Sequence, residues 1–258
     1  MGVEWNRVKE ITLWQYDELI DKMLEVLSYG FVQKEYDIKL SKTRKLAGAL
    51  LTRDDEKYGK YCERILGIIR QVEVFGIRNI SELVETIRDQ TECVNFTEFS
   101  NVSFEDLIVL LNCFMRWILP FPRPIRDFID SDDEEQLEFI SRLRDRGIRN
   151  NLDMLEQCRT PEKRNEIAVL DEIPLDFIVG LSQRADIARL PYVRGKTVLI
   201  LTDAGYDTLD KIANANIEEM VSDLEATLNG KGKKFSRSFI DPEGAISQAR
   251  VLPRVLEF

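Results

Sequence analysis

The apolar residues of this chain recur with the spacing of amphipathic helices. One series contains Leu13, Tyr16, Leu19, Ile20, Met23, Leu24 and Leu27, and another contains Ile65, Ile68, Ile69 and Val72. This spacing places apolar side chains on one face of a helix. No segment shows the sustained apolar and polar alternation that is typical of a strand. The pattern therefore predicts an all-α protein of short helices joined by short connections.

Residues that cap helix N-termini precede many of these apolar series. Each is followed by an acidic or amide side chain three positions later, or directly by a proline. We therefore predict helix starts at Thr12, Asn79, Ser103, Ser131, Asn150, Thr160, Asn216 and Asp241.

One short pattern occurs three times: a glycine, a large apolar residue, a charged residue and then a capping residue. The copies begin at Gly76, Gly147 and Gly205. A glycine just beyond a helix end adopts the left-handed conformation, and the apolar residue after it packs back on the helix. We predict this conformation at all three glycines and a new helix three residues after each, the last one capped by Thr208.

The first two copies belong to a longer repeat. Residues 66–125 and 137–196 are identical at 12 of the 60 positions compared, including Pro120 and Pro191, and the separation is the same as that between Gly76 and Gly147. We call this separation the repeat offset. Duplication of a structural unit explains this similarity, and the alternative is that helical proteins reuse the same capping residues. We divide the chain into an N-terminal helical region, a degenerate repeat and a C-terminal domain, with the boundaries 1–60, 61–131 and 132–258.

The composition limits the catalytic and metal-binding chemistry that the chain can support. The 258 residues include 36 Lys and Arg against 46 Asp and Glu, which gives a formal net charge of -10, and there is no histidine. The commonest general base and metal ligand is therefore missing. The four cysteines are spaced too widely for a zinc pair, and no nucleophile–base pair or glycine-rich nucleotide loop is present. We expect no enzymatic activity, no cofactor, no metal and no small-molecule substrate.

Two segments bear on location. Residues 1–7 lack the apolar core of a secretory signal, and the most apolar stretch, residues 107–121, is too short to cross a bilayer. We expect a cytoplasmic protein that does not enter a membrane.

Two charged segments stand out. The acidic run at residues 130–135 is interpreted as a helix start, because consecutive carboxylates on one helix diverge whereas acids in a first turn complement the helix dipole. Residues 229–238 contain four cations and no acid, with glycines that are typical of a loop. This loop either contacts phosphates or serves as a solubilising surface loop.

The segment ADIARLPYVRGKT at residues 185–197, followed by AGYDTL at 204–209, resembles helix-hairpin-helix domains. It is most similar to an uncharacterised prokaryotic family of tandem helix-hairpin-helix proteins. The similarity extends upstream through GIRN at 147–150 and downstream to ARVLP at 249–253. It covers about residues 137–258 and, more weakly, the preceding repeat. The resemblance implies a fold of tandem helix-hairpin-helix-like repeats.

The resemblance also implies a binding mode. In nucleic-acid-binding members the hairpin is a Gly-x-Gly turn whose backbone amides hold a phosphate without regard to base sequence. Tyr192 and Arg194 stand at these glycine positions, and their side chains crowd the approach to the amides. Arg194, with Gly195 and Lys196 beside it, can replace an amide contact with a charged one.

Two hypotheses for function follow. The first is a non-catalytic protein that contacts DNA or RNA backbone phosphates without sequence specificity. We expect its binding residues to share one basic face: Arg189, Arg194, Gly195, Lys196, Lys231, Lys233, Lys234 and Arg237. The second is a protein–protein interaction scaffold that has lost its phosphate-binding hairpins, which the net charge and the altered hairpin favour. A scaffold would expose a contiguous apolar patch to another protein.

Overall fold

The computed structural model describes residues 3–51, 56–236 and 240–257. Within these ranges the regular elements are helices, with one isolated antiparallel bridge between Pro124 and Asn150. The prediction of an all-α protein is confirmed. The chain divides into two compact units, residues 1–120 and 121–258. The predicted boundaries after residues 60 and 131 do not coincide with this division, because helices on both sides of residue 60 pack into one core.

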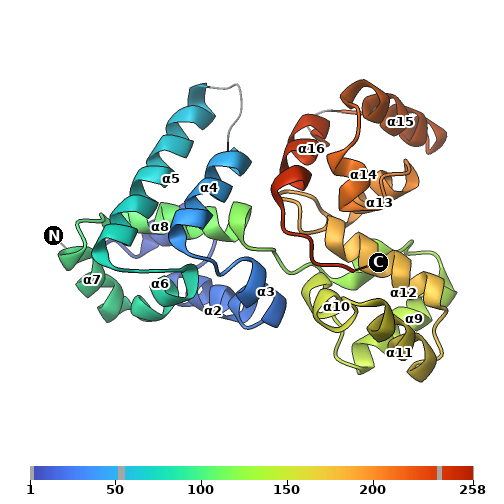
Figure 1. Ribbon diagram of the computed structural model, residues 1–258, viewed down its shortest axis with the longest axis horizontal. Helices are drawn as coiled ribbons and strands as arrows, with labels where there is room; N and C mark the ends of the chain where they lie inside the picture. Colours follow the sequence, from blue (N-terminus) through green and yellow to red (C-terminus); the bar gives the residue numbers. More distant parts are fainter. Residues whose placement is uncertain (1–2, 52–55, 237–239, 258) are drawn as a thin grey trace. The chain divides into compact units, whose positions relative to one another are not determined.

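The described part of the first unit consists of eight α-helices and one π-helical turn, η1 (Figure 1). In chain order these are α1 (Asn6–Thr12), α2 (Tyr16–Leu27), α3 (Gly30–Glu35), α4 (Leu40–Leu51), α5 (Glu56–Phe75), α6 (Ile80–Thr86), α7 (Gln90–Phe99), α8 (Phe104–Cys113) and η1 (Phe114–Ile118).

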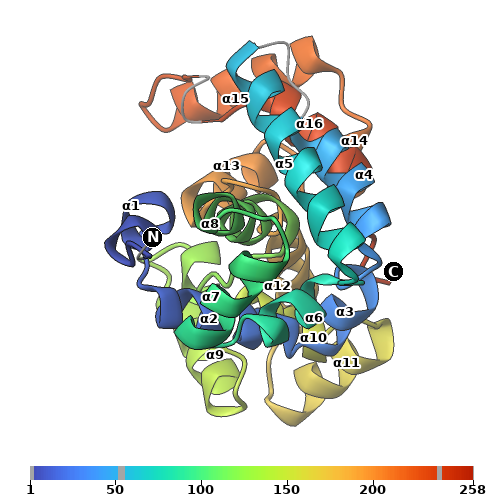
Figure 2. The same cartoon turned by 90° about the vertical axis from the view of Figure 1, so that its left-hand side faces the viewer.

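Helix α8 is the central helix of this unit. Its residues 107–111 are all buried, and α1, α5 and α7 pack against it, as Figure 2 shows around the nearly end-on α8. Helices α4 and α5 lie side by side in both views and run antiparallel, since Gly48 approaches Leu66 while Arg44 pairs with Glu73. Helices α1, α2 and α4 thus pack against α8, α6 and α5, respectively.

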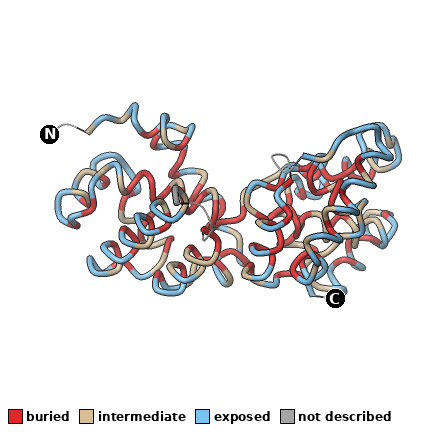
Figure 3. Tube along the Cα trace, turned by 90° about the horizontal axis from the view of Figure 1, so that it is seen from above, coloured by how far each residue is buried: buried red, intermediate tan, exposed pale blue. Residues whose placement is uncertain are grey.

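The second unit begins with a short 3-10 helix and continues with eight α-helices in its described part. They are η2 (Ile125–Phe128), α9 (Glu134–Asp145), α10 (Asn151–Gln157), α11 (Pro161–Leu170), α12 (Leu175–Ile187), α13 (Gly195–Asp203), α14 (Leu209–Ala213), α15 (Ile217–Gly230) and α16 (Pro242–Val251). Helix α12 is central and contacts α10, α11, α13, α14 and η2. Figure 3 shows buried stretches along the inner side of each unit's helices.

The three glycine corners have the predicted geometry. Gly76, Gly147 and Gly205 have φ angles of 112°, 94° and 94°. In each corner the glycine N–H donates to the carbonyl three residues back, and the next N–H donates to the carbonyl five residues back. These bonds satisfy carbonyls at the helix end that have no partner within the helix.

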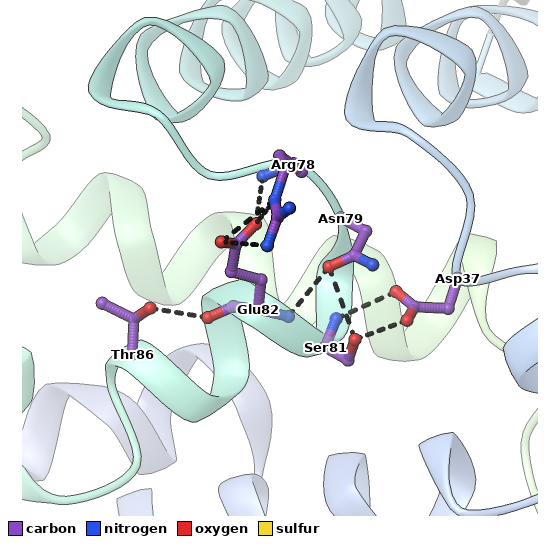
Figure 4. Close-up of polar contacts among 6 residues, drawn as sticks. All are labelled: Asp37, Arg78, Asn79, Ser81, Glu82 and Thr86. Atoms are coloured by element: carbon purple, nitrogen blue, oxygen red, sulfur yellow. Dashed lines mark hydrogen bonds and ion pairs between the residues drawn. The ribbon is translucent and has the colours of Figure 1, made fainter.

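The corner after α5 shows how the next helix starts (Figure 4). Asn79 Oδ1 accepts the N–H of Glu82 at 3.0 Å, and the Glu82 carboxylate accepts the backbone N–H of Arg78 at 2.6 Å and its guanidinium at 3.1 Å. These hydrogen bonds lower the pKa of Glu82. Asp37 accepts both the N–H and the hydroxyl of Ser81, which ties α6 to the segment before α4. Sequence neighbours and a distant acid together fix this corner.

Most of the predicted helix starts are confirmed by a side chain that accepts a backbone N–H of the first turn. These caps are Asn79, Ser103, Asn150, Thr160, Thr208, Asn216 and Asp241. The start at Thr12 is wrong: Thr12 ends α1, and its hydroxyl donates to the carbonyl of Val8 at 2.8 Å. The start at Ser131 is also wrong, because Asp133 caps α9 instead by accepting the N–H of Gln136 at 3.0 Å.

Three helices of each unit begin at equivalent positions. Helices α6, α7 and α8 start at residues 80, 90 and 104, and α10, α11 and α12 start at 151, 161 and 175. Every start in the second set follows its counterpart by the repeat offset, and the first two pairs also have equal lengths.

Candidate nucleic-acid interface

The connection between α12 and α13 is a tight turn. Tyr192 has a φ angle of 64°, in the left-handed region that residues other than glycine rarely adopt, and its side chain is half-exposed. The next residue, Val193, is buried, and Arg194 returns to extended backbone and precedes the first residue of α13. Arg194 is exposed and its side chain does not cap the helix. The turn therefore directs its cationic side chain outward.

Gly195 is required by close packing. A Cβ atom added to it would lie 2.5 Å from both the Cβ and the carbonyl oxygen of Asp127 in η2. Helix α13 therefore packs directly against η2 at its first residue, and Gly195 is buried. Its role here is to permit this contact, and a phosphate at this turn would meet side chains before it met the Gly195 backbone.

A second arginine lies beside Arg194. Arg123 precedes η2, and its guanidinium stacks on the Phe121 ring at 4.8 Å. Its N–H donates to Asn151 Oδ1 at 2.6 Å, and its carbonyl accepts the N–H of Asn151 at 2.9 Å, so its backbone is fixed. Burial lowers the pKa of Arg123, and the positive charge of Arg194 lowers it further, although Asp127 partly opposes the effect. The two arginines are therefore close enough to repel each other.

These cations have few partners of opposite charge. Nε of Arg123 is buried and donates to no acceptor in the part of the chain that the structure describes. Arg194 and Lys196 form no ion pair with any described residue, and the first turn of α13 contains no acid. Arg123 was not among the site residues predicted from the sequence, although it precedes Arg194 by the repeat offset, which could have drawn attention to it. Together Arg123, Arg194 and Lys196 form what we call the hairpin cluster.

Arg189 lies elsewhere. Its side chain is fully buried, and Nε donates to Asp186 at 2.8 Å while the terminal nitrogen donates to the carbonyl of Pro253 at 3.0 Å. The structure therefore does not support a phosphate contact by Arg189, whose charge is already paired inside the unit.

The basic loop after α15 is separate from the hairpin. Lys231 pairs with Asp203, the last residue of α13, whereas the hairpin precedes its first residue. A helix of nine residues is about 13 Å long. Lys233 and Lys234 are exposed and form no ion pair with a described residue, and Arg237 lies outside the described residues. The prediction that the basic residues share one face is therefore wrong. Arg189 is buried, Arg194 and Lys196 lie at the start of α13, and Lys231 pairs with its last residue.

The cysteines and acidic residues do not form a further candidate site among the described residues. The four cysteines are free and buried, and no group of three or more Cys, Asp or Glu among the described residues is arranged to hold a metal ion. None of the described helices has the length and apolar character that crossing a membrane would need.

The comparisons with known proteins give a match in the C-terminal part of the chain. Residues 137–243 match the model of a family described as a domain of unknown function, DUF4332. No curated protein and no solved structure matches the chain. The matched segment runs from α9 to the first turn of α16, so it includes both the α12–α13 turn and the basic loop. The prediction of an uncharacterised domain family in the C-terminal half is confirmed over these residues.

Proposed function

We propose that this chain is a non-catalytic protein that contacts nucleic-acid backbone phosphates through the hairpin cluster. The observation that carries the proposal is the close packing of Gly195 on Asp127, which brings the start of α13 against η2. This packing places Arg194 near Arg123, and the first turn of α13 contains no acid. Bringing like charges together is unfavourable unless an anion binds between them. A phosphate group offers that charge and oxygens that suit a guanidinium.

This arrangement supports binding without base specificity. The cations belong to a turn and a helix start, and contacts to phosphates position a protein on nucleic acid without reading its sequence. Each phosphate neutralised contributes about -0.9 to the slope of log K against log salt for duplex DNA. The three cations of the hairpin cluster would therefore give weak binding that is lost steeply as salt rises. Lys233 and Lys234 would add contacts where the nucleic acid reaches the other end of α13.

We also propose that the α12–α13 turn is a helix-hairpin-helix hairpin within tandem repeats. The support is local: Leu190 and Pro191 precede Tyr192, which holds the left-handed conformation of the glycine it replaces. The equivalent helix starts, each pair separated by the repeat offset, support the repeat. The side chains of Tyr192 and Arg194 replace an amide-lined turn by a charged one.

A direct titration tests the proposed function. Labelled duplex DNA, single-stranded DNA and single-stranded RNA of unrelated sequences would be titrated with the full chain at about 50 mM and 200 mM salt, the range over which phosphate contacts weaken strongly. We expect binding at the lower salt, similar affinities across sequences and a marked loss at the higher salt. Absence of binding to all three at the lower salt would reject the proposal.

One observation favours the scaffold alternative. Val169, Leu170 and Leu175 are exposed around the turn between α11 and α12, with 68%, 59% and 42% of their surfaces accessible. Neighbouring exposed apolar residues are typical of protein contact sites. Under this alternative the wild-type chain self-associates in sedimentation experiments and Leu170→Asp abolishes the association. A strictly monomeric wild-type chain would argue against self-association through this surface.

A further inference from the structure

A row of lysines on α4 is a second place where positive charge gathers. Lys39 immediately precedes α4, and Lys42 and Lys45 follow at intervals of three residues. Side chains three apart on a helix are neighbours, about 5–6 Å apart at Cβ. All three are exposed, and none forms an ion pair with a residue that the structure describes. We call these three residues the α4 lysine row.

Helix stability does not explain the α4 lysine row. Lys39 and Lys42 lie at the N-terminal end of α4, where the helix dipole is positive and cations are unfavourable. Eleven other α-helices of the described chain have an acid in the first turn, and α4 has none. Neighbouring lysines also repel each other. The row therefore weakens the helix that bears it.

The described acids closest to α4 along the chain and on α5 have other partners. Glu73 on α5 pairs with Arg44 at 3.1 Å, and Asp37 accepts the N–H and hydroxyl of Ser81. Residues 39–51 contain four Lys or Arg and no acid. The surface of α4 is therefore locally positive within a chain whose net charge is -10.

The residue types on the exposed face of α4 favour one class of partner over the others. Of the leucines of α4, Leu40, Leu50 and Leu51 are buried against the unit and Leu46 is partly buried, so none is exposed. Ser41 is the exposed residue beside Lys42. A helix that lies on a membrane exposes large apolar residues next to its lysines. Protein interfaces favour aromatic residues and arginine and are depleted in lysine. Lysines alone, as mobile point charges, fit the phosphates of a nucleic-acid backbone.

We infer that the α4 lysine row is a second binding site for nucleic-acid backbone, located on the first unit. It uses residues outside the matched family segment and does not depend on the hairpin cluster. Either site can bind without the other.

The test compares two triple variants of the full chain. Lys39→Ala/Lys42→Ala/Lys45→Ala removes the row. Lys22→Ala/Lys34→Ala/Lys163→Ala removes the same charge from lysines that pair with Glu18, Glu35 and Glu166. The probe is a labelled 20-base-pair duplex of mixed sequence. For the row variant we expect affinity at least about tenfold weaker at low salt and a slope of log K against log salt shallower by about 2.7. The control should change less than about twofold, because its lysines are already neutralised.

A thermal melt separates this effect from misfolding. Removing repulsive lysines from the positive end of α4 should leave the midpoint equal to or above that of the wild type. Equal affinity and slope in the two triple variants would overturn the inference, as would a row variant that loses binding to phosphatidylserine vesicles while keeping wild-type affinity for the duplex. The affinity of Arg194→Ala/Lys196→Ala for the same duplex tests the hairpin cluster independently. If that variant binds as the wild type does and the row variant does not, the proposed function fails and this inference stands.

Discussion

Asn101 and Glu172 both have left-handed backbone, with φ angles of 58° and 51°, and the repeat offset separates them. Asn101 connects α7 to α8, and Glu172 connects α11 to α12. This conformation costs a non-glycine residue about 1 kcal/mol or more. Its recurrence in equivalent connections, together with the equivalent helix starts, supports a repeated structural unit beyond shared capping residues.

The glycine corners give a test of backbone strain. Gly147→Ala should lower the free energy of unfolding by about 1 kcal/mol, because φ at this position is left-handed. Gly67→Ala is the matched control, since Gly67 lies within α5 with open space around its Cβ position. Alanine there should be neutral or stabilising by up to about 1 kcal/mol. Urea unfolding measures both, and destabilisation of equal size would contradict the account.

The sequence predicted these corners because their causes are local. A glycine, an apolar residue and a cap within four positions are sufficient to end one helix and begin the next. The predicted helix starts at Thr12 and Ser131 are wrong, because the sequence pattern does not show which of several nearby polar side chains caps a helix. The Thr12 hydroxyl bonds back to its own helix, and the acidic run offers several possible caps, of which Asp133 is used.

The candidate site was less predictable. Arg194 and Lys196 were predicted from the resemblance to helix-hairpin-helix domains, but Arg123 joins them only through the packing of η2 on α13. Arg189 lies only a few residues before Arg194, just beyond the end of α12, yet its side chain pairs with Asp186 inside the unit. Sequence proximity therefore did not distinguish a surface cation from a buried one.

The buried pair makes a prediction about Arg189. Arg189→Met leaves Asp186 buried without its partner, and we expect a loss of about 3–5 kcal/mol in the free energy of unfolding. The double variant Asp186→Leu/Arg189→Met removes both charges and should recover most of that loss. Chemical unfolding of both variants checks this. A single variant as stable as the wild type would show that Asp186 does not need Arg189.

Close packing at the hairpin makes another prediction. Gly195→Ala should destabilise the second unit by about 1–3 kcal/mol, because its Cβ would overlap Asp127. Gly180→Ala, in α12 and with nothing within 4 Å of the added Cβ, is the control and should be neutral or stabilising. If unfolding experiments give the two variants the same stability, Gly195 does not pack tightly against Asp127.

The Arg78–Glu82 contact predicts a pH dependence. Because the folded pKa of Glu82 is lowered from its ordinary value of 4.5, its ionised form is favoured in the folded state. The resulting stabilisation is fully present above that ordinary value and is lost as pH falls through the lowered pKa. The difference in free energy of unfolding between wild type and Glu82→Gln should therefore shrink in acid. A difference that stays constant down to pH values below the folded pKa would contradict the assignment, and NMR titration of Glu82 measures that pKa directly.

The most direct test of the account is the salt dependence of nucleic-acid binding by the wild type and Arg194→Ala/Lys196→Ala. Both chains would be titrated against one labelled duplex at several salt concentrations, with Lys163→Ala/Lys211→Ala as a control in which each lost lysine is paired with an acid. Two lost phosphate contacts should make the slope of log K against log salt shallower by about 1.8, with weaker binding at every salt and an unchanged control. A hairpin variant with the affinity and slope of the wild type would contradict the claim that this turn holds phosphates.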